Sequence, residues 1–218
     1  MYARASSGEA DGLPCGDFWD VVTIPAGVRM IVGDVRGSGP AAARTAQRVI
    51  DDWRQLCPRE PTLRGIALRL DSRIDDLATA EDPELFVSAI LLTFFEGRGC
   101  EIVRCGHPPA LVIGAGRAAW ADAMPPEPPL GLARVAGTWA ETTYLPFAPG
   151  GRILLMTDGA TECRDPKGRF FPVADAAADL SGRGGAELVG ELGSRLREHR
   201  AGEAADDTLL VLVGRPPE

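Results

Sequence analysis

The chain has 218 residues, 45% of them hydrophobic, and carries a formal net charge of −8 at pH 7. This length and apolar content are enough for one large core or two small ones. The acidic charge argues against nucleic acid or an anionic membrane as the main partner. The longest apolar run, residues 87–95, is far shorter than the roughly 20 residues that a spanning helix needs.

The cysteines are scattered along the chain and form no Cys-x-x-Cys pair: Cys15, Cys57, Cys100, Cys105 and Cys163. This usage is typical of a protein in a reducing compartment and offers no structural zinc site. Nothing in the sequence resembles a signal peptide. We therefore expect a cytoplasmic protein.

The first part of the chain alternates between strand and helix patterns. Residues 18–24 and 28–33 are rich in β-branched and aromatic residues, and the Pro-Ala-Gly turn between them predicts a hairpin. Pro40 opens a helix that is expected to end at Leu56. A second helix, also opened by a proline, is predicted over 61–77.

The rest of the chain shows runs of strands and a final pair of helices. Strands are predicted at 85–95, 100–104, 110–113, 142–145, 152–157 and 209–213, with a turn at 96–99, a loop over 114–138 and helices at 172–180 and 185–199. The charged end of the last helix, SRLREHR, is predicted to be a solvated face with an exposed His199. Because strands come in runs and helices in pairs, the pattern favours the α+β class over alternating βαβ units.

Short acidic motifs fall at the ends of predicted strands: Gly16-Asp17, Gly33-Asp34, Thr157-Asp158-Gly159 and Asp206-Asp207. Such pairs are also ordinary turn sequences. However, a charge at a strand end on a core is costly unless something neutralises it. Aspartate oxygens suit Mg²⁺ or Mn²⁺, and a neighbouring glycine lets the backbone approach the cation closely. The motifs together favour a divalent metal site.

These motifs belong to an ordered series: CGDFWD, GDVRGSG at 33–39, CGHPP at 105–109, PLGL at 129–132, TDGATE at 157–162 and ADDTLLVLV at 205–213. The series resembles the metal-dependent serine/threonine phosphatases of the PPM (protein phosphatase 2C) class, in particular the bacterial branch typified by SpoIIE and RsbU. The resemblance implies an α-β-β-α sandwich of two mainly antiparallel sheets flanked by helices. It makes 16–218 the phosphatase domain and leaves 1–15 as a short N-terminal segment, either the remnant of a longer protein or the start of a minimal phosphatase.

The resemblance also implies roles for individual residues. Asp34 matches the aspartate that bridges two metal ions, and the carbonyl of Val35 matches the backbone ligand beside it. Asp158 matches the second carboxylate of the first ion, and Asp17 matches an acid that reaches the pair directly or through water. Glu162 falls where many relatives keep another acid near an accessory metal.

The chemistry implied by the resemblance is direct hydrolysis supported by two Mn²⁺ or Mg²⁺ ions. A metal-bridging hydroxide attacks phosphorus in line, and no covalent enzyme intermediate forms. Arg36 occupies the place where eukaryotic members carry a histidine, and its guanidinium can clamp a phosphate but cannot donate a proton at neutral pH. The general acid therefore stays unassigned. No Cys-x5-Arg loop is present, which argues against a cysteine nucleophile.

The last acidic motif allows two alignments with the family. Matching the aspartates makes Asp206 the metal ligand, with Asp207 as the alternative. Matching Thr208 instead would put Ala205 at the ligand position and weaken the site. We prefer the first alignment because it keeps a carboxylate where a cation needs one. For His107, a hydrogen bond that pins its loop and a role facing the substrate both remain open.

The function implied is a protein serine/threonine phosphatase acting on a phosphorylated regulatory protein, an anti-sigma-factor antagonist with a STAS domain. The alternative is a catalytically weak or inactive phosphatase-fold module that acts as a sensor or scaffold in partner switching. The presence of Asp17, Asp34 and Asp158 favours catalysis. In relatives the helices after the GDxxGxG loop take part in regulation, so a homodimer mate or an activator is expected at 40–77, and no nucleic acid or membrane partner is expected.

Overall fold

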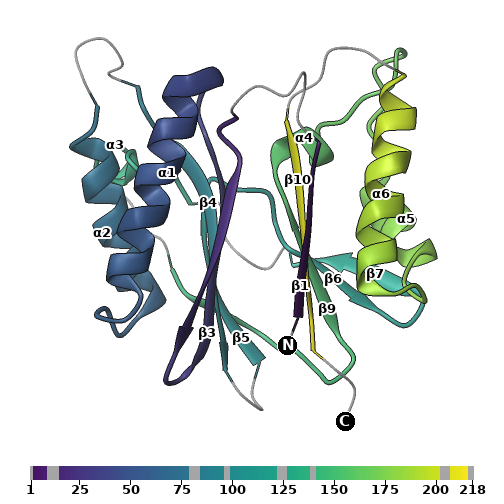
Figure 1. Cartoon of the computed structure of the whole chain (residues 1–218), viewed down its shortest axis with the longest axis horizontal. Helices are drawn as coiled ribbons and strands as arrows, with labels where there is room; N and C mark the ends of the chain where they lie inside the picture. The colour runs from purple at the N-terminus through teal and green to yellow at the C-terminus, as the bar shows by residue number, and fades with distance from the viewer. Residues whose placement is uncertain are drawn as a thin grey trace. The chain divides into compact units, whose positions relative to one another are not determined.

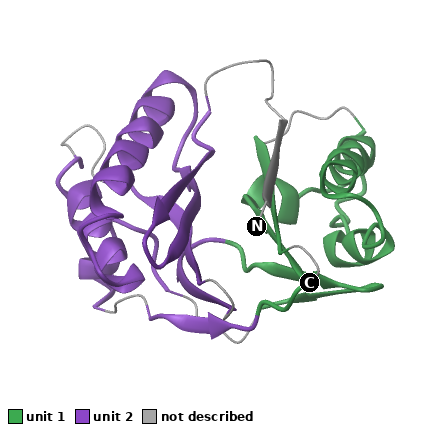
Figure 2. Ribbon diagram, turned by 60° about the horizontal axis from the view of Figure 1, so that its bottom comes forward, with its two compact units in different colours: residues 1–12, 108–123, 147–218 green, residues 13–107, 124–146 purple. Residues whose placement is uncertain are grey.

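The computed structural model describes residues 2–8, with their backbone only, and residues 15–78, 84–95, 99–121, 127–137, 141–201 and 207–215. They fall into two compact units (Figure 2). Unit 1 comprises residues 1–12, 108–123 and 147–218, and unit 2 comprises residues 13–107 and 124–146. Each unit holds one antiparallel five-stranded sheet. No helix among the described residues is long and apolar enough to cross a membrane.

Unit 2 is a sheet in the order β2-β3-β4-β5-β8 with helices α1 and α2 packed on one face (Figure 1). Its elements are β2 (Phe18–Ile24), β3 (Gly27–Val35), α1 (Gly39–Leu56), α2 (Leu63–Asp75), β4 (Val87–Phe95), β5 (Gly99–Cys105), α3 (Ala133–Ala136) and β8 (Thr143–Leu145). The predicted hairpin is confirmed as β2–β3, with Gly27 at a φ of 145° where a side chain would collide with the carbonyl of Phe94. Side-chain alternation along β3 buries Ile31 and Val35 in the core under the helices. Asp34 therefore points away from α1 and α2.

A buried arginine joins β3 to the connection between the two helices. Arg29 is 4% exposed, and its guanidinium donates to the carbonyls of Cys57, Glu60 and Pro61 at 2.7–2.8 Å. These carbonyls follow the end of α1, where backbone acceptors lack helical partners and the helix dipole favours a cation. Arg29 thus fixes the strand that carries Asp34 to the helix pair that follows it.

Unit 1 is a sheet in the order β1-β10-β9-β6-β7 with helices α5 and α6 on one face (Figure 1). Its elements are β1 (Tyr2–Gly8), β6 (Leu111–Gly114), β7 (Arg117–Trp120), β9 (Arg152–Met156), α4 (Asp158–Thr161), α5 (Val173–Asp179), α6 (Gly185–Arg200) and β10 (Thr208–Gly214). Leu188, Leu192 and Leu196 recur at helical spacing on α6 and are all buried in the core of this unit. That stripe of leucines fixes the helix against its sheet.

The α+β class with two antiparallel sheets and flanking helices is confirmed, as are the long strands and helices. The prediction of a continuous loop over 114–138 is wrong, because β7 and α3 lie within it. The side chain of Asp71 on α2 accepts hydrogen bonds from the backbone of Gly131 and Ala133 and so holds the α3 turn, a tertiary contact that local patterns do not show. Residues 96–98 of the predicted turn lie outside the described residues.

Two further elements were not predicted. The segment 1–15 contains β1, which pairs along its length with β10, and the TDGATE motif forms the short helix α4 after β9. The strand β1 has few β-branched or large apolar residues, so its structure depends on a partner near the other end of the chain. The division into a segment 1–15 and a domain 16–218 remains a prediction.

Candidate metal centre

In unit 2, the backbone around Gly16 lies against the end of β3. The amide of Val35 donates to the carbonyl of Gly16 at 3.3 Å. A Cβ added at Gly16 would lie 2.6 Å from the carbonyl oxygen of Val35 and 2.7 Å from Oδ1 of Asp34. Both oxygens therefore border the same small space beside Gly16, and they are the two ligand atoms that the family resemblance implies. Asp17 follows at once, half-buried, immediately before β2.

A serine of the neighbouring strand β4 lies beside Asp34. Ser88 lies opposite Asp34 in the β3–β4 ladder, so the two side chains share a face of the sheet. The hydroxyl of Ser88 is 3.0 Å from Nδ1 of His107, which is 2% exposed. This contact provides the hydrogen bond expected if His107 pins its loop.

In unit 1, the turn after β9 carries Asp158 as the first residue of α4. Thr157 is fully buried; its hydroxyl accepts from the amide of Leu209 at 2.9 Å, and its amide donates to the carbonyl of the same residue at 3.1 Å. A side chain at Gly159 would collide with the carbonyl of Asp207. The β9–α4 turn and the start of β10 are therefore packed backbone to backbone.

The C-terminal end of α6 contacts both the β9–α4 turn and the start of β10. Arg200 donates from Nη2 to the carbonyl of Gly159 at 2.9 Å and to the hydroxyl of Thr208 at 3.0 Å. The sequence pattern missed this residue because it lies in the charged run that was predicted to be a solvated face. His199 is likewise half-buried rather than exposed, since its ring packs edge-on against Phe171 at 5.3 Å.

Arg36 lies just after β3, where its backbone amide donates a hydrogen bond to the backbone carbonyl of Phe86. Its Nη2 is 3.1 Å from the carboxylate of Glu84, and its guanidinium carbon lies 5.9 Å from the centroid of the Phe86 ring. The side chain is 43% exposed. The guanidinium is thus accessible and held by a surface carboxylate, while its predicted role in phosphate binding remains a proposal.

Buried cysteines do not provide a nucleophile. Burial raises the pKa of the thiols of Cys57 and Cys100 to about 12. The pKa of Cys105, two residues before His107 in the chain, is raised mainly by burial and also by Asp71 and Glu127. A thiol in that state stays protonated at neutral pH and is a poor nucleophile.

The structure groups the predicted ligands within each unit. Asp34, the Val35 carbonyl and Gly16-Asp17 lie together in unit 2, and the Asp158 turn lies against Asp207 in unit 1. Asp206 and Ala205 lie outside the described residues, so the alignment of the last motif stays open. Glu162 is exposed at the end of α4. Among the described residues, no three histidine, cysteine, aspartate or glutamate side chains cluster closely enough to hold a metal ion. Convergence of all four carboxylates therefore stays a prediction.

Solved structures with similar folds include bacterial phosphatase domains. The RsbU and RsbW domains of a Mycobacterium tuberculosis protein match with a TM-score of 0.77 and 23% identity, over 99% of this chain and 61% of that chain. The PP2C phosphatase domain of SpoIIE from Bacillus subtilis, with a fragment of its regulatory domain, matches with a TM-score of 0.76 and 17% identity, over 98% and 62%. RsbX in complex with magnesium matches with a TM-score of 0.65 and 15% identity, over 96% and 93%.

This chain spans about three fifths of the length of the first two structures. Its fold is that of a PPM-type, or protein phosphatase 2C, domain. Residues 25–216 match the family model described as Stage II sporulation protein E (SpoIIE). The chain belongs to the SpoIIE family. The match contains Asp34, Asp158 and the last acidic motif, whereas Asp17 precedes it. No curated protein sequence matches the chain.

Proposed function

We propose that the chain is a metal-dependent phosphatase that hydrolyses phosphoserine or phosphothreonine in a regulatory protein, of the STAS-domain anti-sigma-factor antagonist type. The observation that carries this proposal is the close approach at Gly16, where the absence of a side chain lets Oδ1 of Asp34 and the carbonyl oxygen of Val35 both lie near the position that a Cβ would take. A carboxylate and a carbonyl at one point form the start of an all-oxygen ligand set, which is what Mg²⁺ and Mn²⁺ require. The residues present therefore fit the metal ions that the family resemblance implies.

The proposed ligands are Asp17, Asp34, the Val35 carbonyl, Asp158 and one of Asp206 and Asp207. Two bound ions would neutralise charge on the phosphoryl group and activate a water for direct attack on phosphorus. The aspartates hold and orient the ions. Arg36 binds the phosphate through its planar guanidinium, which matches phosphate oxygens better than a lysine does. Glu84 would be displaced from Arg36 when phosphate binds.

Partner proteins are proposed from the same family context. One structural neighbour carries RsbU and RsbW domains in a single protein. In this chain, α1 and α2 border a polar groove lined by both acidic and basic residues: Arg48, Asp51, Asp52, Gln55, Arg73, Asp76 and Leu77. We propose this helix pair as the surface for an activator or for a second copy of the chain.

The test is hydrolysis by the purified chain of p-nitrophenyl phosphate and of a serine-phosphorylated STAS-domain protein, with Mn²⁺ or Mg²⁺ titrated against EDTA. We expect metal-dependent release of phosphate. Asp34→Asn and Asp158→Asn should each lower kcat/KM by roughly 1,000-fold, because several kcal/mol of charge stabilisation would be lost. The matched control is Asp179→Asn, whose carboxylate is exposed and paired only with Arg195 among the contacts described.

Full activity in either ligand variant would disprove the assignment of the site. A wild-type chain that binds Mn²⁺ yet hydrolyses neither substrate would indicate the alternative, a phosphatase-fold module that acts as a sensor or scaffold.

A further inference from the structure

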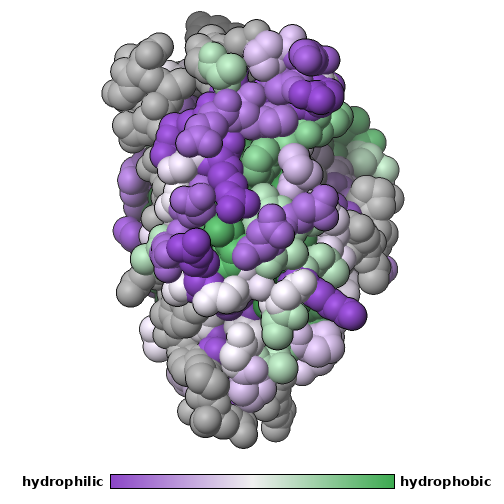
Figure 3. Space-filling view, turned by 90° about the vertical axis from the view of Figure 1, so that its right-hand side faces the viewer, coloured by the Kyte–Doolittle hydropathy of each residue, from purple (hydrophilic) through white to green (hydrophobic). Residues whose placement is uncertain are grey.

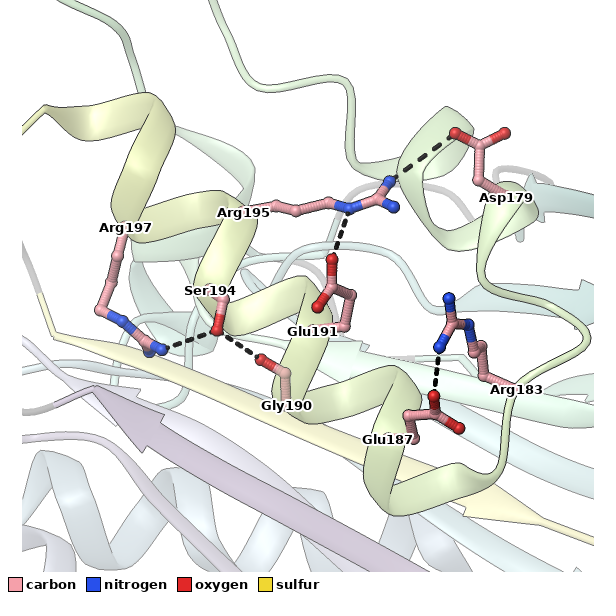
Figure 4. A network of polar contacts seen from close by, with 8 residues as sticks. All are labelled: Asp179, Arg183, Glu187, Gly190, Glu191, Ser194, Arg195 and Arg197. Carbon is pink, nitrogen blue, oxygen red and sulfur yellow. Dashed lines mark hydrogen bonds and ion pairs between the residues drawn. The ribbon is translucent and has the colours of Figure 1, made fainter.

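The end of α6 makes contacts that differ from those of the other charged residues on this helix. The face of the molecule over α5 and α6 carries mainly hydrophilic side chains with apolar ones between them (Figure 3). Along α6 these side chains pair locally, as Glu187 does with Arg183 and Glu191 with Arg195, while Arg197 donates to Ser194 (Figure 4). Arg200 instead turns into unit 1 and is half-buried.

One nitrogen of Arg200 joins the two acidic segments of unit 1. Nη2 donates to the carbonyl of Gly159, which immediately follows Asp158, and to the hydroxyl of Thr208, which immediately follows Asp207. The two acceptors are themselves close, because a Cβ at Gly159 would lie 2.9 Å from Oγ1 of Thr208. Arg200 therefore bridges the residue after Asp158, a proposed ligand, and the residue after Asp207, one of the two candidates for the last ligand.

The position of Arg200 is itself fixed from both sides. The buried leucines Leu188, Leu192 and Leu196 set the helix on the sheet. Next to Arg200, Nε2 of His199 lies 2.9 Å from the carbonyl of Arg169. The helix then ends at Ala201 in a left-handed conformation with φ of 53°. Because the Arg200 side chain starts from a fixed position, its hydrogen bonds can determine the position of the Asp158 turn.

We propose that Arg200 is a positioning residue for the metal centre: its guanidinium fixes the Asp158 turn against the start of β10 so that the carboxylates of this unit are pre-aligned to bind the cation. The proposal rests on the proposed phosphatase function. It follows from a general property of metal sites, in which groups that orient the ligands typically contribute 10–100-fold to metal affinity. Arg200 itself touches neither substrate nor metal in this role.

The turn at Asp158 is also held by hydrogen bonds that do not involve Arg200. Loss of Arg200 should therefore weaken the alignment of the metal ligands without unfolding the unit. Thr157 holds the same two segments through its paired contacts with Leu209. Arg200→Gln removes the charge and the guanidinium fork, whereas Arg200→Lys keeps the charge with a different donor geometry. Arg197→Gln is the matched control, an exposed arginine one turn earlier on the same helix that donates to Ser194.

The experiment measures Mn²⁺ binding by calorimetry, the Mn²⁺ dependence of p-nitrophenyl phosphate hydrolysis, and the urea unfolding midpoint in EDTA. We expect Arg200→Gln to weaken Mn²⁺ binding at least about 10-fold and to raise the Mn²⁺ concentration needed for half-maximal activity in parallel. KM for the phosphate ester at saturating Mn²⁺ should stay unchanged. Arg200→Lys should fall between wild type and Arg200→Gln, and Arg197→Gln should match wild type.

Unchanged Mn²⁺ affinity in a folded Arg200→Gln chain would overturn the proposal, even if the unfolding midpoint fell, since that pattern marks a purely structural arginine. Should Arg200→Gln fail to fold, Thr208→Val decides, because it removes one of the two acceptors. Several-fold weaker binding supports the proposal and wild-type binding overturns it. A wild-type chain that neither binds Mn²⁺ nor hydrolyses phosphate would overturn the proposed function and this inference together.

Discussion

The two units hold their acidic residues in different ways. In unit 2, Asp34 lies within a regular antiparallel ladder, and a glycine lets the backbone pass close to its carboxylate. In unit 1, Asp158 begins the short helix α4 after β9 and Asp207 directly precedes β10, and side chains of Thr157 and Arg200 hold these two segments together. A ligand in a strand is placed by register, whereas a ligand in a turn needs extra contacts from elsewhere in the fold.

The largest expected effects come from the two glycines beside these ligands. In Gly159→Ala, the added methyl group would collide with a backbone carbonyl, and we expect the free energy of unfolding to fall by roughly 2–3 kcal/mol. Urea unfolding measures this change.

In Gly16→Ala, the methyl group would lie between Oδ1 of Asp34 and the carbonyl of Val35, so Mn²⁺ affinity should fall about 100-fold or more. Titration with Mn²⁺ measures this change.

Gly190→Ala is the control for this pair, because nothing lies within 4 Å of a Cβ at that position in α6. It should stabilise the helix by about 0.5–1 kcal/mol, the usual gain from glycine to alanine in a helix. Wild-type Mn²⁺ affinity in Gly16→Ala would show that this glycine does not border the metal.

Part of the fold and one of the acidic positions could be predicted from the sequence. The hairpin of β2 and β3, the helix opened by Pro40 and the acidic residue near the end of β3 follow from local periodicity and turn residues, and the structure confirms them. The strand β7, with the sequence Arg-Ala-Ala-Trp, has no β-branched residue and gives no local signal.

Contacts between distant segments explain why the α3 turn and the role of Arg200 were not predicted from the sequence. Asp71 caps the α3 turn from another helix, and Arg200 reaches Gly159 from the end of a charged helix. In both cases the partner is far away in the chain, and neither residue stands in a recognisable motif. The acidic motifs could therefore be found from the sequence, but the residue that holds the unit 1 segments could not.

The next largest effect concerns the strand that carries Asp34. Arg29→Met would leave the carbonyls of Cys57, Glu60 and Pro61 without this buried donor. We expect a loss of about 2 kcal/mol in the free energy of unfolding, since hydrogen bonds to charged groups contribute about 1.5–3 kcal/mol each and removal of the buried charge offsets part of their loss. Arg69→Met is the control, because its side chain is 63% exposed and its ion pair with Glu60 contributes little. Equal effects of the two substitutions would contradict the role of Arg29.

Buried thiols make unit 2 sensitive to alkaline pH. The folded-state pKa of Cys57 and Cys100 is about 12, above the ordinary value of 9.0, so the unfolded chain loses these protons first. Their stabilising contribution is complete below pH 9 and is lost as pH rises from 9 towards 12. The slope reaches at most about 1.4 kcal/mol per pH unit for each thiol.

The measurement is the free energy of unfolding between pH 8 and 10.5 for wild type and for the double variant Cys57→Ala/Cys100→Ala. The decline with pH should be shallower in the double variant, whatever its stability at pH 8. Parallel declines would show that these thiols titrate alike in the folded and unfolded chain.

The smallest effect is expected at the end of α6. Ala201 adopts a left-handed conformation that costs a non-glycine residue roughly 1–2 kcal/mol, and the more flexible unfolded chain of a glycine variant offsets part of that. Ala201→Gly should therefore stabilise the chain by about 0.5 kcal/mol and leave Mn²⁺ affinity unchanged, because Arg200 keeps its position. A destabilised variant would contradict the strain inferred at this residue.

The most direct test of the central proposal, that Asp34 and Asp158 are metal ligands of one centre as the family resemblance implies, is Mn²⁺ calorimetry on four chains. These are wild type, Asp34→Asn, Asp158→Asn and the double variant. We predict two Mn²⁺ ions per wild-type chain, strongly weakened binding in each single variant, and a double variant little weaker than the worse single one, because ligands of one centre do not act additively. Losses that simply add in the double variant, or wild-type binding in either single variant, would contradict it.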